Sequence, residues 1–203
     1  NRIFIDCNVQ SPADMLSPGR IGMTAILPVR FTAMKWYGKG PLETYPDRQC
    51  GGRMGVYSED VRNQPFYLRP QEYGLHMESR SMRLTDPDRA DFVRFEAACP
   101  MAMSAVPYSD LQLWNARHPP ELPAPETLYV HLDYAHRGLG NSSCGPDALP
   151  TYRIDDRPCR FGFALEAGLG EREDNPFGPI PEEIPAYHPW KAVGEQDRTP
   201  SYR

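Results

Sequence analysis

Hydrophobic and polar positions alternate one by one in two segments of this sequence, residues 128–134 and 161–165. The apolar side of the first segment is formed by every second residue: Leu128, Val130, Leu132 and Tyr134. A period of two is typical of β-strands that bury one face, since successive side chains point to opposite sides of a sheet. We therefore predict a strand at each of these two places.

Further segments carry the same signature less regularly and are bounded by Gly, Pro, Asn or Asp. They are Arg2–Val9, Gly22–Phe31, Met34–Tyr37, Met54–Tyr57, Phe66–Arg69, Met77–Leu84, Phe92–Ala97 and Met101–Val106. One short helix is predicted after Ser109, a favourable N-cap, and it should end near Arg117 because two prolines follow. The pattern predicts an all-β fold with antiparallel strands.

Composition narrows the class of protein. The chain has 203 residues and 23 prolines, which is roughly twice the ordinary proline usage. Because proline interrupts helices, a helical bundle or coiled coil is excluded. No apolar run approaches the roughly 20 residues that a membrane-spanning helix needs, so we expect no membrane partner.

Charge is concentrated at the end of the chain. The net charge is -5, and residues 166–203 contain eight Asp or Glu and four Arg or Lys, a balance of -4. The nearly neutral body lacks the basic face with which proteins bind phosphates, so we expect no nucleic-acid partner. The end is also rich in proline, which favours extended chain. We predict a β-sandwich domain over residues 1–167 and a Pro-rich acidic linker or tail over 168–203.

The five cysteines are dispersed and form no C-x-x-C pair, so no metal site or redox site is predicted. Their odd number leaves the compartment and their thiol or disulfide state open.

The densest motif runs from Trp36 to Arg48, and its second half reads Tyr45-Pro46-Asp47-Arg48. Aromatic rings beside carboxylates and Arg are found at sugar sites. A structural corner is the favoured interpretation, with Asp47 and Arg48 bonding buried backbone or each other.

A second motif contains Gln71, Glu72 and His76. Glu72 and His76 could supply an acid and a base across a turn. With no second carboxylate nearby, a solvated hairpin tip is the favoured interpretation.

A third motif begins with His131 and Asp133 on one face of a predicted strand and continues into a Gly-rich loop. Metal binding by these residues and His136 matches no strong signature. Small polar residues in such a loop can bond ligand hydroxyls, and a plain connection is the alternative. Cys144 has no neighbour in the sequence that would activate it as a nucleophile.

Taken in order, these motifs resemble the C-terminal, small-chain domain of the large bacterial β-galactosidases of glycoside hydrolase family 2. The resemblance rests on Trp36–Arg48, Pro70–Gly74, Val106–Ser109 and His131–Pro146 and spans most of residues 1–165. It implies an antiparallel β supersandwich related to galactose mutarotases, placed last in an enzyme that hydrolyses terminal β-galactosides with retention. It also implies that both catalytic carboxylates lie on a TIM barrel outside this chain, so the chain alone should be inactive.

The resemblance carries over to individual residues as well. In some family members the loop after Gly140 places a tryptophan against the sugar, and Cys144 matches that position here. Asn141 and Ser143 are then candidates to rim the pocket beside Cys144. The resemblance also implies a group of fold-defining or near-site residues without a catalytic role. They are Tyr45, Asp47, Arg48, Gln71, Glu72, His131 and Asp133.

The resemblance leads to expectations about partners. The galactoside would be bound through the parent's barrel, other domains of the same chain would be neighbours, and the parent could be a homo-oligomer. No cofactor is expected in this chain, although the parent could use a divalent cation. Because the sequence does not begin with Met, we interpret it as an excised or processed piece. Its location is left open, with a periplasmic or extracellular bacterial location favoured over the cytoplasm.

Two other functions stay open at this point. One is a free-standing mutarotase-like isomerase or carbohydrate-binding module, in which Glu72, His131 and His136 act as acid and base groups. Faster anomer exchange of galactose in polarimetry would favour it. The other is a purely structural domain that supports the barrel.

Overall fold

The computed structural model describes residues 2–10, 17–140, 145–155 and 157–170 of the chain. Its strands are β1 (Arg2–Val9), β2 (Arg20–Pro28), β3 (Ala33–Gly40), β4 (Arg53–Asp60), β5 (His76–Thr85), β6 (Phe92–Val106), β7 (Thr127–His136) and β8 (Cys159–Gly168). The helical segments are short: α1 (Asp110–Asn115) and the 3-10 turns η1 (Val61–Asn63), η2 (Pro119–Glu121) and η3 (Pro150–Tyr152). The predicted all-β fold is confirmed.

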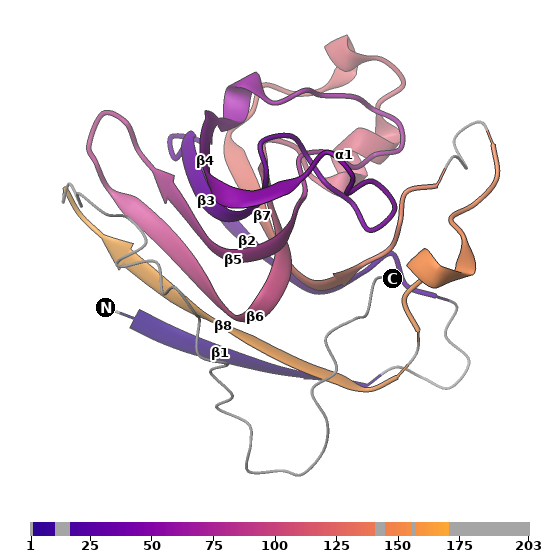
Figure 1. Ribbon diagram of the computed structural model, residues 1–203. Helices are drawn as coiled ribbons and strands as arrows, with labels where there is room; N and C mark the ends of the chain where they lie inside the picture. Colours follow the sequence, from indigo (N-terminus) through magenta and orange to yellow (C-terminus); the bar gives the residue numbers. More distant parts are fainter. Residues whose placement is uncertain (1, 11–16, 141–144, 156, 171–203) are drawn as a thin grey trace, which may run out of the picture.

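The strands pair antiparallel in the order β1-β8-β6-β5-β3-β4, and β7 joins at β6 and carries β2. The long strand β6 makes this branch possible, because residues 92–97 pair with β8 while residues 102–106 pair with β7. The strands therefore curl around a common interior as an all-β sandwich (Figure 1).

Strand β6 replaces two predicted strands. Phe92–Ala97 and Met101–Val106 are predicted as separate strands, and the structure shows one strand of 15 residues that includes Pro100. Pro100 lies where β6 changes partners, outside both the β8 ladder and the β7 ladder. Its missing N–H therefore interrupts no pairing there.

The strand predicted at Phe66–Arg69 is wrong, because this segment is irregular. Prolines flank it on both sides and remove donors that a strand would use. Phe66 instead packs edge-on against Tyr73, with ring centroids 5.7 Å apart. The predicted helix is present, although it ends at Asn115, and Ser109 caps it as expected.

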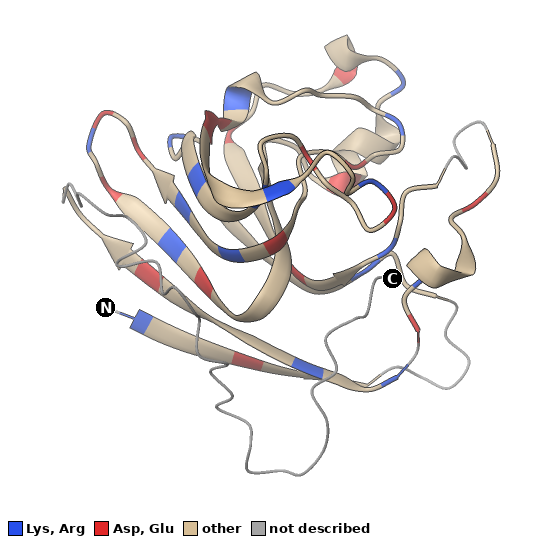
Figure 2. Cartoon of the chain, viewed as in Figure 1, with Lys and Arg blue, Asp and Glu red and all other residues tan. Residues whose placement is uncertain are grey.

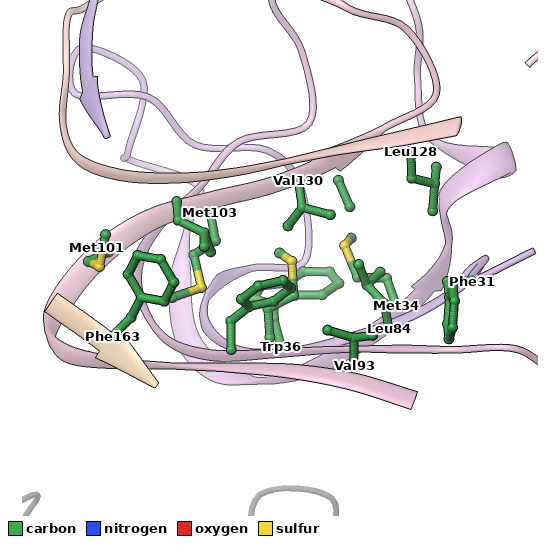
Figure 3. Close-up of a cluster of buried hydrophobic side chains, with 14 of the residues drawn as sticks. Phe31, Met34, Trp36, Leu84, Val93, Met101, Met103, Leu128, Val130 and Phe163 are labelled. Carbon is green, nitrogen blue, oxygen red and sulfur yellow. The ribbon is translucent and has the colours of Figure 1, made fainter. Parts of the chain in front are cut away.

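The main hydrophobic core draws side chains from β3, β5, β6, β7 and β8 (Figure 3). On β3 buried and partly exposed positions alternate, so Met34 and Trp36 point into this core while Lys35 and Tyr37 point away. The Trp36 indole donates to the Lys39 carbonyl at 3.0 Å, which satisfies its single N–H. Outside this core, Arg20 at the start of β2 pairs with His136 at the end of β7, so these two polar residues lie side by side.

The boundary predicted after residue 167 stays a prediction. Strand β8 runs to Gly168, and residues 171–203 lie outside the described residues.

Candidate functional site

The Tyr45-Pro46-Asp47-Arg48 motif holds the start of the Gly-rich loop. Asp47 accepts hydrogen bonds from the backbone amides of Leu139 at 3.1 Å and Gly140 at 2.7 Å. Arg48 donates from Nη2 to the Gly140 carbonyl at 3.1 Å. The two charged side chains thus bond the backbone of the other motif, and Tyr45 is fully buried beneath them.

Glu43 joins the first motif to the second. It accepts hydrogen bonds from the Tyr67 hydroxyl and, at 2.7 Å, from the Gly74 amide. The backbone amide of Thr44 also donates to the Leu75 carbonyl at 2.7 Å. All three sequence motifs are therefore tied to one another.

Glu72 is the centre of a polar cluster. It pairs with Arg20 on β2, accepts a hydrogen bond from the Tyr45 hydroxyl at 3.2 Å, and lies 3.5 Å from His136 Nε2. Burial alone would raise the pKa of Glu72, but the interaction with His136 and the Arg20 charge hold this pKa below its usual value. The expectation of a solvated hairpin tip is therefore wrong, since the Glu72 side chain is only 11% exposed.

The ring of His136 is fixed on its other side. Nδ1 donates to the Arg137 carbonyl at 2.6 Å, so Nε2 is the atom turned toward Glu72. Because the ring also packs edge-on against Tyr45 at 5.4 Å, the imidazole is oriented from three directions.

The proposed acid and base pair of the second motif is not assembled. His76 lies in the interior, stacked on Trp36 with ring centroids 3.9 Å apart, and its nearest carboxylate is Glu59 at 3.7 Å. Glu72 instead meets His136, which lies much later in the chain. Gln71 adopts a left-handed backbone (φ 70°) and lines the cavity described below.

His131 and Asp133 lie on β7 beside the same cluster. His131 Nδ1 bonds the Thr24 hydroxyl at 3.1 Å, and Nε2 lies 3.8 Å from Asp110. Asp133 Oδ2 faces Arg20 Nη1 at 3.6 Å. Burial, together with the Arg20 charge, lowers the pKa of His131 to about 4. Burial raises the pKa of Asp133 to about 7, although the Arg20 charge opposes this shift.

A cavity of about 1000 Å³ opens over this cluster. Its walls come from α1, from the segment before β5 and from the loop that follows β7. The lining residues are Gly19, Arg20, Arg69, Pro70, Gln71, Glu72, Asp110, Leu111, Trp114, His136, Arg137, Gly138, Leu139 and Asp147. In the described part of the chain, acidic and basic residues are interspersed along the ribbon (Figure 2).

Sequence reasoning missed two members of this site. Arg20 stands alone at the start of β2, with no neighbouring motif that would have marked it. Asp110 was seen only as part of the predicted helix. Conversely, the candidates Asn141, Ser143 and Cys144 lie outside the described residues, and only the preceding Gly138 and Leu139 are seen to line the cavity.

Three features of the described residues bear on function. They contain no group of three or more His, Cys, Asp or Glu side chains arranged to hold a metal ion. None of the helices in the described part of the chain is long and apolar enough to cross a membrane. No disulfide joins the cysteines in that part, which are Cys7, Cys50, Cys99 and Cys159.

The fold and the cavity describe an all-β sandwich domain with a polar pocket, and sequence comparison shows the family of this domain. Residues 1–165 match the family described as beta galactosidase small chain. The chain belongs to this family.

Similar proteins carry the name beta-galactosidase. The protein of Staphylococcus xylosus is 31% identical over 156 residues, which cover 75% of this chain and 16% of that protein. The protein of Arthrobacter sp. (strain B7) is 34% identical over 74% of this chain and 15% of its own length. The protein of Pseudoalteromonas haloplanktis is 29% identical over 81% of this chain and 15% of its own length. The chain thus spans about one sixth of these relatives.

Proposed function

We propose that this chain is the accessory C-terminal domain of a retaining β-galactosidase of glycoside hydrolase family 2, which hydrolyses terminal β-galactosides. The family match over residues 1–165 carries the proposal, and the names of the relatives support it. In this proposal the acid/base and nucleophile carboxylates belong to a barrel outside the chain.

The chemistry of the cavity agrees with an accessory role. A retaining glycosidase needs one protonated carboxyl group and one free carboxylate about 5 Å apart across the sugar bond. Glu72 is held by Arg20 and Tyr45 and has a lowered pKa, so it is poorly suited to donate a proton. Asp133 has a raised pKa, but its side chain is 1% exposed and does not line the cavity.

The proposed contribution of the domain is to frame the parent's sugar pocket. Asp47 and Arg48 fix the backbone of Gly140, which follows the cavity-lining residues Gly138 and Leu139. Asn141, Ser143 and Cys144 follow directly and would rim the pocket. The loop sequence, Asn-Ser-Ser-Cys over residues 141–144, offers hydrogen-bonding side chains and contains no aromatic residue.

The test compares hydrolysis of a nitrophenyl β-galactoside by this chain and by the full-length parent. We expect turnover by the parent and none by the chain. In the parent, Asp47→Ala should lower kcat/KM by about tenfold or more, because a misplaced loop costs transition-state contacts. Asp6→Ala, which changes a surface carboxylate paired with Arg160 on β8, is the matched control and should leave kcat/KM unchanged. Robust hydrolysis by the chain alone would overturn the proposal.

A further inference from the structure

Asp110 and Trp114 form a pair on helix α1. They are four residues apart, so they lie on the same side of the helix. Both line the cavity, yet the Asp110 side chain is 56% exposed and Trp114 is 66% exposed. Trp114 therefore offers a large apolar surface to a molecule that enters the cavity.

The helix that carries this pair is held rigidly. Ser109 accepts a hydrogen bond from the Gln112 amide at 3.2 Å, and the Gln112 side chain accepts one from the Ser109 amide at 2.8 Å. Leu113 is buried on the inner side of α1, and its carbonyl accepts from Arg69 on the opposite wall at 3.4 Å. The Trp114 ring is therefore presented by a fixed support.

The Asp110 carboxylate retains the capacity to accept hydrogen bonds. Its Oδ2 lies 3.6 Å from Arg20 and its Oδ1 lies 3.8 Å from His131. Both distances exceed the 2.7–3.2 Å of a hydrogen bond to nitrogen. The Arg20 charge attracts the carboxylate without a hydrogen bond, and both carboxylate oxygens can still accept hydrogen bonds from a ligand.

The charges around the cavity balance. Arg20, Arg69 and Arg137 face Glu72, Asp110 and Asp147. Arg137 is already paired with Asp147, and Arg20 with Glu72. A balanced wall favours a neutral polar ligand, because a charged ligand would meet as much repulsion as attraction.

We propose that this cavity is a binding site for a neutral monosaccharide within the chain itself. The Trp114 ring covers the apolar C–H face of the sugar, and the Asp110 carboxylate accepts hydrogen bonds from two adjacent hydroxyls. A flat aromatic wall combined with a few fixed polar groups is the usual construction of a small-ligand site. The site goes beyond the accessory role, since it needs no residue of the parent's barrel.

The test titrates the 203-residue chain with D-galactose and follows the indole N–H signals by NMR. The Trp114 signal is assigned by its loss in Trp114→Phe. We expect saturable movement of this signal with a dissociation constant of about 1 mM, as befits a small open site. The signal of Trp36, which is 1% exposed, should stay in place, and glycerol at equal concentration should produce no saturable shift.

Variants test the two contacts by calorimetry. Trp114→Ala and Asp110→Asn should each weaken galactose binding by about tenfold or more, the effect of losing one good contact. Phe4→Ala is the matched control, because Phe4 is an equally exposed aromatic residue (68%) on β1, outside the cavity lining. No saturable binding, or equal binding by Trp114→Ala and Phe4→Ala, would overturn the proposal. Neither result would touch the accessory role, which is tested by hydrolysis in the parent.

Discussion

Asp47 holds Gly140 through its backbone, with a hydrogen bond of 2.7 Å from the Gly140 amide to Oδ2 across a separation of 93 residues. The neighbouring Arg48 donates a hydrogen bond to the Gly140 carbonyl at 3.1 Å. Asp47 and Arg48 together therefore satisfy both backbone polar groups of Gly140. Gly140 is the last described residue before the loop 141–144. The corner formed by Asp47 and Arg48 therefore fixes the backbone of Gly140 itself.

Asp47→Ala should destabilise the chain by about 2 kcal/mol, because two backbone amides lose a charged acceptor and water replaces it only in part. Hydrogen exchange should show faster exchange at Leu139 and Gly140, and urea unfolding gives the free energy. Asp6→Ala removes a surface carboxylate and should cost less than about 1 kcal/mol. Unchanged exchange at Leu139 and Gly140 would contradict the assigned role of Asp47.

Gly140→Ala should also destabilise the chain, by about 1–3 kcal/mol, the cost of placing a residue with a Cβ in the left-handed region. Gly140 has φ +60°, and an added Cβ would lie 2.5 Å from the Ala148 nitrogen. Gly51→Ala is the matched control, since a Cβ there meets nothing within 4 Å. Urea unfolding of both variants measures the difference, and equal stability would show that the loop adapts.

The strands were largely predictable because burial on one face imposes alternation, as Leu128, Val130 and Leu132 show. The continuity of β6 through Pro100 was not predictable, because a proline is tolerated in a strand only where its N–H has no pairing partner, and the sequence does not show the partners. The sequence motifs of the site could be predicted singly, but the contacts between them could not. Arg20 and Glu72 are 52 residues apart, and their pairing follows from the curl of the sheet and from no local pattern.

Glu72→Gln should cost about 2–3 kcal/mol of stability, somewhat less than the loss expected when one partner of a fully buried ion pair is removed. The amide keeps the size of the side chain but leaves Arg20 without its nearest charge partner. Chemical denaturation at pH 7 measures the effect. Glu96→Gln serves as control, because Glu96 is 42% exposed where it pairs with Arg2 and should matter by less than about 1 kcal/mol. Equal losses in the two variants would show that the cluster is not a centre of stability.

His131 and Asp133 respond to pH in opposite directions. The pKa of His131 falls to about 4 in the folded chain, below its ordinary value, so its contribution to stability is present above about 6.5 and is lost as pH falls. The pKa of Asp133 rises to about 7, above its ordinary value, so its contribution is present near pH 4 and is lost as pH rises toward 7. Between about pH 4 and 7, the contribution of His131 makes stability rise with pH and that of Asp133 makes it fall, so the two pH dependences offset each other.

Removing either group should therefore expose the slope of the other. Asp133→Asn should give a free energy of unfolding that rises with pH between about 4.5 and 7 more steeply than that of the unaltered chain. His131→Gln should give one that falls with pH over the same interval, relative to the unaltered chain. Glu72, whose pKa is lowered, adds a contribution to stability that is lost as pH falls, but Glu72 is present in all three proteins, so this contribution cancels in the comparison. Urea unfolding at half-unit steps of pH measures all three proteins. If the free energy of unfolding varied with pH in the same way in all three proteins, the assigned pKa shifts of His131 and Asp133 would be contradicted.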